Sequence, residues 1–217
     1  MSNKLKFRLS IMSFVILALL SVALFYYYKI QTSWVDSPVY SRKGTEPART
    51  LVVVYSRTGN TFGAAKEISS FLNAELLQIK APQYDTTING QMLASKDADN
   101  EVTMTDIQHK AVDLSQYELI VLCSPTWWFR PAPPLWSFVE NHNFSGKKVF
   151  LMMTGNSRYK NKFIDEFETL VKQKNGDFAD FLFIRRGRIF WQKTPDDVSV
   201  EIREALEKRK FFMQYKD

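Results

Sequence analysis

Short apolar runs alternate with stretches of helical periodicity along most of the chain. The apolar runs cover residues 51–55, 75–79, 118–123, 148–153 and 181–184. They are continuous rather than alternating, which is typical of strands buried on both faces of a parallel sheet. Helical patterns fit between them, over residues 62–72, 134–141, 160–174 and 196–212. This alternation predicts an α/β fold with an open, doubly wound parallel sheet and helices on both faces.

One long stretch, residues 80–116, interrupts this alternation. It is rich in Asp, Asn, Thr and Gln and has only a short helical pattern, near residues 106–112. A connection of that length inside a compact domain is usually functional or mobile. We expect a largely irregular segment here, and its composition does not indicate a role.

The N-terminal segment contains twenty consecutive residues without a charged side chain, residues 9–28. A helix of that length spans a hydrocarbon core of roughly 30 Å. We therefore predict a transmembrane helix within residues 1–29, a linker over residues 30–49 and the α/β domain over residues 50–217. The alternative is a signal peptide cleaved after the small-x-small triplet of residues 21–23, which would leave a secreted protein.

Basic residues flank the apolar run on both sides. Three basic residues lie within the first eight, and three lie within about fifteen residues after the run: Lys4, Lys6 and Arg8, then Lys29, Arg42 and Lys43. The higher density before the run favours a single-pass protein whose main domain is extracytoplasmic, although the counts are equal.

Charge and composition argue against two functional classes. The chain has 29 Lys+Arg against 23 Asp+Glu, and four of these basic residues lie in residues 1–29, where no acidic residue occurs. The rest of the chain is nearly neutral, which argues against nucleic-acid binding. A single cysteine, Cys123, excludes an intrachain disulfide and a CxxC site, and only two histidines are present. We therefore expect no metal site.

A hydroxyl-rich loop follows the first predicted strand and precedes the first predicted helix of the domain. It reads Ser56-Arg57-Thr58-Gly59-Asn60-Thr61. A phosphate at this position would meet backbone N–H groups and the positive end of the helix dipole. The hydroxyls and the Asn60 amide add donors, and Gly59 allows close approach of the backbone. The loop has neither GxGxxG nor GxxxxGK[ST], so it is not a dinucleotide or Walker loop. An ordinary capped turn is the alternative.

In this loop the chain resembles the flavodoxin superfamily, whose FMN phosphate loop has the same pattern. Two further stretches resemble the family's flavin loop and its third ligand loop: residues 115–128 (SQYELIVLCSPTWW) and 146–156 (GKKVFLMMTGN). The segment with Tyr84 and residues 96–98 is similar to a membrane-associated or exported branch with a Pro-x-Trp-Trp loop. The resemblance implies a flavodoxin-like sheet of five strands in the order 2-1-3-4-5.

The resemblance also implies FMN as a non-covalent cofactor, held by three groups of residues. Its phosphate would contact Ser56, Arg57, Thr58, Gly59, Asn60 and Thr61. The isoalloxazine would lie beside Pro125, Thr126, Trp127, Trp128 and Phe129, with Thr154, Gly155 and Asn156 at its other edge. Arg57 and the pair Phe129-Arg130 depart from the usual family pattern, and the bulky pair could alter the turn of the flavin loop.

Residue types alone also favour ring contact by the aromatic loop, since prolines stiffen it and flat aromatic faces stack on heteroaromatic rings. The alternative is that Trp127 and Trp128 close the core or form a partner surface.

Cys123 is expected to be a buried strand residue. The basic cluster Arg185, Arg186 and Arg188 could receive an acidic group such as the phosphate of a nicotinamide cofactor, but a solvated face or contact with anionic lipid is favoured.

These features predict a membrane-tethered, FMN-binding redox protein. Electrons or hydride would pass through FMN from NAD(P)H to a quinone or a protein acceptor, either in an oxidoreductase or in an electron-transfer protein. No side-chain acid–base pair stands out, so we predict no catalytic residue. The alternative is a flavodoxin-fold binding or assembly module without flavin.

Overall fold

A computed structural model of the protein describes residues 3–188 and 191–216. The chain divides into two compact units, residues 1–33 and 34–217. The first unit contains one helix, α1 (Asn3–Thr32), and buries none of its described side chains. Its length and apolar composition are sufficient to cross a membrane, and residues 9–28 lie within it. A signal sequence would have the same properties.

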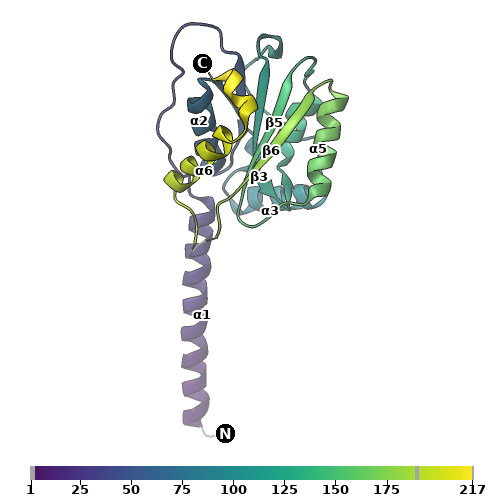
Figure 1. Cartoon of the computed structure of the whole chain (residues 1–217). Coiled ribbons are helices and arrows are strands. Elements are labelled where there is room, and N and C mark those ends of the chain that lie inside the picture. Colours follow the sequence, from purple (N-terminus) through teal and green to yellow (C-terminus); the bar gives the residue numbers. More distant parts are fainter. Residues whose placement is uncertain (1–2, 189–190, 217) are drawn as a thin grey trace. The chain divides into compact units, whose positions relative to one another are not determined.

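The second unit is built on a parallel sheet (Figure 1). Its strands lie in the order β2 (Glu75–Ile79), β1 (Thr50–Tyr55), β3 (Leu119–Trp127), β5 (Lys148–Gly155) and β6 (Asp177–Arg185). A short sixth strand, β4 (Arg130–Pro131), pairs antiparallel with the end of β3. Counting the parallel strands along the chain gives the order 2-1-3-4-5. The predicted flavodoxin-like sheet is therefore confirmed.

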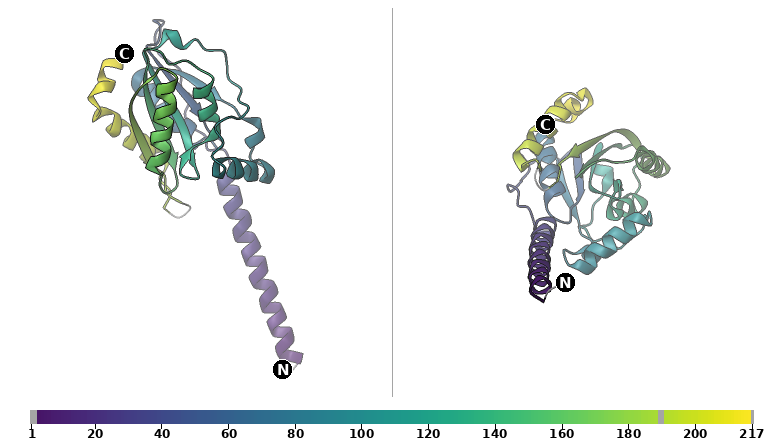
Figure 2. Two further views of the ribbon diagram at one scale, coloured as in Figure 1. Left: turned by 90° about the vertical axis from the view of Figure 1, so that its right-hand side faces the viewer. Right: turned by 90° about the horizontal axis from the view of Figure 1, so that it is seen from below.

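Helices cover both faces of this sheet (Figure 2). On one face lie α2 (Asn60–Leu72) and α6 (Pro195–Glu207), whose buried side chains pack with Val52 and Val54 of β1. On the other lie α3 (Ile88–Asp99), α4 (Pro133–Glu140) and α5 (Asn161–Gln173), which pack with Leu51 and Val53. Because successive strand residues point to opposite faces, a continuous apolar run such as residues 51–55 supplies both cores.

The segment 80–116 differs from the prediction. Residues 106–112 form no helix, and Gln108 instead makes an isolated antiparallel bridge with Lys80. The helix of this segment is α3, preceded by a short 3₁₀ helix, η1 (Pro82–Tyr84), and followed by another, η2 (Leu114–Gln116). The buried residues of α3 are small, Gly90, Ala94 and Ala98. Such a face has little hydrophobic periodicity, so the sequence pattern does not indicate this helix.

The last predicted helix, residues 196–212, is shorter than expected. α6 ends at Glu207, and a separate 3₁₀ helix, η3 (Lys210–Tyr215), follows it. The break lets Phe212 and Tyr215 reach the core on the α2 side, where Phe212 meets Phe150 edge-on with ring centroids 4.8 Å apart. The apolar residues that suggested a longer helix therefore pack from a different backbone conformation.

Residues 34–43, within the predicted linker, lie along α2. The Val35 N–H donates to the carbonyl oxygen of Thr58, just before α2 begins. The Lys66 ammonium donates to the Pro38 carbonyl oxygen at 2.8 Å. The Tyr40 hydroxyl donates at 2.6 Å to the carbonyl oxygen of Ala74, which lies just past the end of α2. This segment, called here the strap (residues 34–43), is thus held mainly through main-chain carbonyl groups.

The start of α6 offers a test of local stability. Thr194 caps this helix, because its Oγ1 accepts from the Asp197 N–H at 3.1 Å and the Asp197 carboxylate accepts from the Thr194 N–H at 2.9 Å. We expect Thr194→Ala to lower the free energy of unfolding by about 1 kcal/mol. Urea unfolding of the full chain in detergent, followed by tryptophan fluorescence, measures it.

Thr169→Ala is the matched control, because the Thr169 hydroxyl donates to the Asp165 carbonyl within α5 and caps nothing. Its removal should change stability by less than about 0.5 kcal/mol. Equal losses in the two variants would contradict the capping role.

Candidate functional site

Three loops meet at the carboxyl edge of the parallel sheet. The register pairs Val54 of β1 with Cys123 of β3, and Pro125 of β3 with Thr154 of β5. The loops after β1, β3 and β5 are therefore neighbours. A hydrogen bond of 2.9 Å joins the hydroxyls of Thr61 and Thr154, both of which are buried. The structure thus brings together the three groups of residues that the sequence singled out.

The loop of residues 56–61 leaves main-chain donors available at the start of α2. Gly59 is the N-cap residue and has a left-handed backbone, with φ of 83°, and no side chain caps this helix. Thr87 caps α3 and Thr194 caps α6, whereas α4 and α5 also begin without a side-chain cap. The first N–H groups of a helix have no partner within it. The N–H groups of residues 60–62 are thus arranged to receive an anion, and the helix dipole adds positive potential.

The strap lies directly against this loop. The Val35 N–H donates to the Thr58 carbonyl oxygen at 2.9 Å. A Cβ atom added at Gly59 would lie 2.2 Å from the Val35 carbonyl oxygen and 3.1 Å from the Trp34 ring. Gly59 is therefore required for two reasons, its positive φ and the close approach of the strap. Asn60 supports the loop from within, since its amide donates to the Thr58 hydroxyl at 3.1 Å.

The aromatic loop after β3 is a tight hairpin. Trp127 pairs with Arg130 across a turn of two residues, Trp128 and Phe129. Both have positive φ, 47° and 70°, as a type I′ turn requires. Asn and Gly are the residues that suit these positions, and bulky side chains are strained there by about 1–3 kcal/mol each. The bulky pair thus forms a turn that its residue types disfavour.

The two tryptophans of this hairpin have different surroundings. Trp127 is half-buried and meets Tyr55 and Tyr84 edge-on, each with ring centroids 5.5 Å apart. Trp128 is 49% exposed, and its indole N–H donates to the Ser95 hydroxyl at 2.9 Å. Trp127 therefore packs against the core, as the alternative interpretation of this loop predicts. Trp128 instead presents an open aromatic face at the edge of the sheet.

Phe129 is held by cations rather than by the core. The charged groups of Arg158 and Lys160 lie 5.2 and 5.1 Å from the centre of its ring. The Lys160 N–H also donates to the Phe129 carbonyl oxygen at 3.0 Å. These contacts join the hairpin to the segment after β5. Gly155, the last residue of β5, is half-buried, and Asn156, which follows it, is exposed.

Two buried hydroxyls at this edge find no hydrogen-bond partner within residues 3–188 and 191–216. They are Tyr55 Oη, at the end of β1, and Thr126 Oγ1, in the hairpin. Burial raises the pKa of Tyr55, so its phenol stays protonated and can donate. A Cβ atom at Gly155 would lie 3.0 Å from Thr126 Oγ1, which places this glycine beside the orphaned hydroxyl. Buried polar atoms without partners are rare and call for an explanation.

The sequence did not indicate that residues 80–116 support the hairpin. Tyr84, from η1, packs against Trp127, and its hydroxyl donates to the Asp97 carboxylate at 2.8 Å. Burial raises the pKa of Tyr84 to about 12. Ser95, from α3, accepts the Trp128 bond. The signal for this segment in the sequence was its similarity, around Tyr84 and residues 96–98, to a membrane-associated or exported branch of the flavodoxin superfamily.

Cys123 and the basic cluster at the end of β6 differ in their surroundings. Cys123 is fully buried on the α2 side of the sheet, and burial raises the pKa of its thiol, which confirms a structural strand cysteine. In the basic cluster, Arg185 and Arg188 are exposed, as a solvated face predicts. Arg186 differs, because it is only 8% exposed. The prediction of a solvated face is therefore wrong for Arg186.

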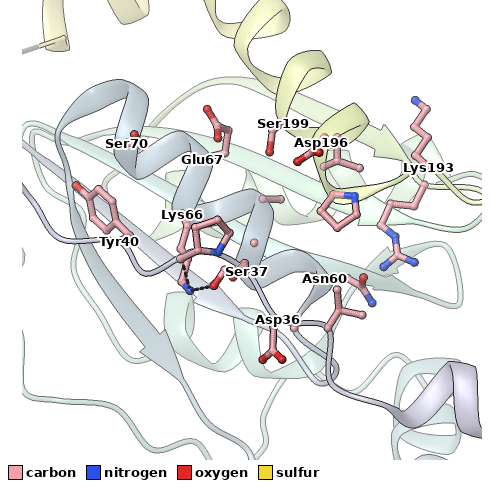
Figure 3. A pocket seen from close by; sticks show the side chains of 18 of the residues that line it. Asp36, Ser37, Tyr40, Asn60, Lys66, Glu67, Ser70, Lys193, Asp196 and Ser199 are labelled. Atoms are coloured by element: carbon pink, nitrogen blue, oxygen red, sulfur yellow. Dashed lines mark hydrogen bonds between the residues drawn. The ribbon is translucent and has the colours of Figure 1, made fainter.

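A pocket of about 540 Å³ lies between the strap, α2 and the start of α6 (Figure 3). Gly59 and Asn60 of the first loop line it, together with Arg186. Tyr40 and Ser70 lie toward one end of the pocket and Asn60 toward the other (Figure 3). The first loop therefore borders a cavity large enough for part of a small molecule.

Solved structures with a similar fold include a flavoprotein from Lactobacillus acidophilus NCFM in complex with FMN, which is 21% identical with a TM-score of 0.53. That match covers 63% of this chain and 93% of the other. A protein from Bacteroides eggerthii DSM 20697 designated a flavoprotein is 19% identical with a TM-score of 0.58, covering 74% and 96%. Another from Bacteroides uniformis ATCC 8492 is 20% identical with a TM-score of 0.56, covering 73% and 99%.

No curated protein sequence matches this chain significantly. A family profile described as flavodoxin matches residues 49–177. That match includes β1, the loop of residues 56–61, the aromatic hairpin and the loop after β5. It covers more than half of the chain. The chain therefore belongs to the flavodoxin family.

Proposed function

We propose that this chain binds FMN non-covalently at the carboxyl edge of the sheet and works as a redox protein. The observation that carries the proposal is the uncapped start of α2, where the glycine turn of the family's loop leaves N–H groups free for a phosphate. Ser56, Arg57, Thr58, Gly59, Asn60 and Thr61 would form the phosphate site. The FMN complex of the Lactobacillus acidophilus flavoprotein, which has a similar fold, supports this assignment.

The flavin ring would lie between the aromatic hairpin and the loop after β5. Pro125, Thr126, Trp127, Trp128 and Phe129 would line one side, and Thr154, Gly155 and Asn156 the other. The orphaned hydroxyls of Tyr55 and Thr126 fit a ring rich in carbonyl and nitrogen acceptors. Trp128 has the open face for stacking, because Trp127 is already packed between two tyrosines.

FMN supplies electron or hydride transfer when it is bound. The chain's own part is to hold the phosphate, orient the ring and limit water at the hairpin. We propose NAD(P)H as the donor and a quinone or protein as the acceptor, with α1 as a membrane anchor and the second unit outside the cytoplasm. The length and apolar composition of α1 support the anchor, and its flanking basic residues support the orientation.

The binding of FMN can be measured on the full chain in detergent. We expect the purified protein to quench FMN fluorescence on titration and to show the absorption of bound flavin near 375 and 450 nm, which are rough positions set by the chromophore. Thr58→Ala should weaken binding roughly tenfold, because a hydrogen bond to a charged phosphate contributes about 1.5–3 kcal/mol.

Ser145→Ala is the control for this titration, since Ser145 is exposed and lies just before β5, at the opposite edge of the sheet. It should bind FMN as the natural protein does. A chain that stays colourless and does not bind FMN would overturn the proposal. It would favour a flavodoxin-fold binding or assembly module without flavin.

The strained hairpin gives a second test. We expect Trp128→Asn combined with Phe129→Gly to raise the free energy of unfolding by about 1 kcal/mol, because relief of backbone strain exceeds the lost hydrogen bond and ring contacts. The same variant should bind FMN more weakly, because the open aromatic face is lost. Urea unfolding and FMN titration measure the two effects.

Ser95→Ala separates these contributions, since it removes the partner of the Trp128 indole but keeps the turn. It should lower stability by about 1 kcal/mol or less. A double variant less stable than the natural protein would show that side-chain contacts, rather than backbone strain, decide the energy of this turn.

A further inference from the structure

We propose that Arg186 binds the phosphate group of the flavin nucleotide and supplies the site with a positive charge from outside the loop of residues 56–61. The inference rests on the proposed function and adds a residue to the same site. Arg186 follows β6, about 125 residues after the phosphate loop. It would add a second cation to a phosphate site whose loop already contains Arg57.

Arg186 is a buried cation without a counter-charge. It is 8% exposed, and no hydrogen bond or ion pair joins its guanidinium to another residue of the described chain. Burial alone lowers the pKa of Arg186 to about 10, and no carboxylate opposes that shift. Arg186 lines the pocket described above, so an anion that enters the pocket can supply the negative charge that this largely buried cation lacks.

The other cations of the pocket are already engaged. Lys66 donates to the main-chain carbonyl groups of Ser37 and Pro38 at 3.2 and 2.8 Å (Figure 3). Lys193 forms an ion pair with Glu201 on α6. Arg186 is therefore the cation of this pocket that remains available among the residues described.

The carboxylates of the pocket do not neutralise Arg186. Glu67 is paired with Arg203, at 2.5 Å. Asp36 and Asp196 are exposed, so water screens their charges. An anion that enters the pocket beside Arg186 would thus meet an uncompensated positive charge.

Main-chain bonds hold Arg186 at the same edge as the phosphate loop. Its N–H donates to the Gly155 carbonyl oxygen at 2.8 Å, and its carbonyl oxygen accepts from the Lys193 N–H at 2.7 Å. Thr154, next to Gly155, is bonded to Thr61 of the phosphate loop. Arg186 also lines the same pocket as Gly59 and Asn60.

Two sources of positive potential thus border one cavity, the uncapped start of α2 and the Arg186 guanidinium. A phosphate monoester carries close to two negative charges near neutral pH and offers several acceptor oxygens. It can accept from main-chain N–H groups and from a guanidinium at once. This pairing favours a phosphate over a single carboxylate as the ligand.

Comparison of FMN with riboflavin tests the inference, because riboflavin has the same ring and no phosphate. Dissociation constants come from flavin fluorescence quenching on the full chain in detergent. We expect Arg186→Gln to weaken FMN about 10- to 100-fold and to leave riboflavin binding unchanged. Arg186→Lys should restore part of the FMN affinity, since it keeps the charge but not the planar fork.

Arg185→Gln is the matched control, because Arg185 is the exposed neighbour of Arg186. It should bind both flavins as the natural protein does. Arg186→Met tests for a merely structural role. Without FMN its melting temperature should equal or exceed that of the natural protein, since an unpaired buried charge is removed. FMN should raise the melting temperature of Arg186→Met by less than it raises that of the natural protein.

Three results would overturn the inference. In the first, Arg186→Gln binds FMN as tightly as the natural protein. In the second, Arg186→Gln loses affinity for FMN and for riboflavin to the same extent. In the third, Arg185→Gln loses as much FMN affinity as Arg186→Gln. In each case the natural protein still binds FMN, so the proposed function stands. A natural protein that binds neither flavin would overturn the proposed function and this inference with it.

Discussion

The parallel pairing of β1, β3 and β5 determines where the loops of the candidate site meet. Main-chain hydrogen bonds fix Val54 beside Cys123 and Pro125 beside Thr154. Because parallel strands end at the same edge, three loops far apart in the sequence become neighbours there. The Thr61–Thr154 bond then joins the first loop to the third. The strand order itself creates the place where a ligand can meet all three.

Several locally unfavourable features gather at that edge. The start of α2 lacks a side-chain cap, and among the described residues the buried Arg186 has no counter-charge and the hydroxyl of Tyr55 has no partner. The turn at Trp128 and Phe129 has a backbone that bulky residues disfavour. Elsewhere in the domain, α3 and α6 have side-chain caps, whereas α4 and α5 do not. Such a concentration is expected where a chain is organised for a ligand rather than for its own stability.

The sheet could be predicted from the sequence because strands buried on both faces leave continuous apolar runs, as at residues 51–55. The loop of residues 56–61 was recognisable from its hydroxyls and glycine. Helix α3 could not be predicted, because Gly90, Ala94 and Ala98 are its buried residues, while the large apolar residues Ile88 and Met92 are exposed. The strap along α2 depends on bonds to main-chain carbonyl groups, which leave no pattern in residue types. The burial of Arg186 depends on packing, which its exposed neighbours do not reveal.

If the three loops bind one flavin nucleotide together, FMN should protect all three at once. Hydrogen–deuterium exchange of the full chain in detergent, with and without FMN, measures this protection. We predict slower amide exchange in residues 56–61, 124–130 and 154–156 at the same FMN concentration, and little change in α5 and at the amino ends of the strands. Protection in the first loop alone, or in none of the three, would contradict binding of one flavin nucleotide by all three loops.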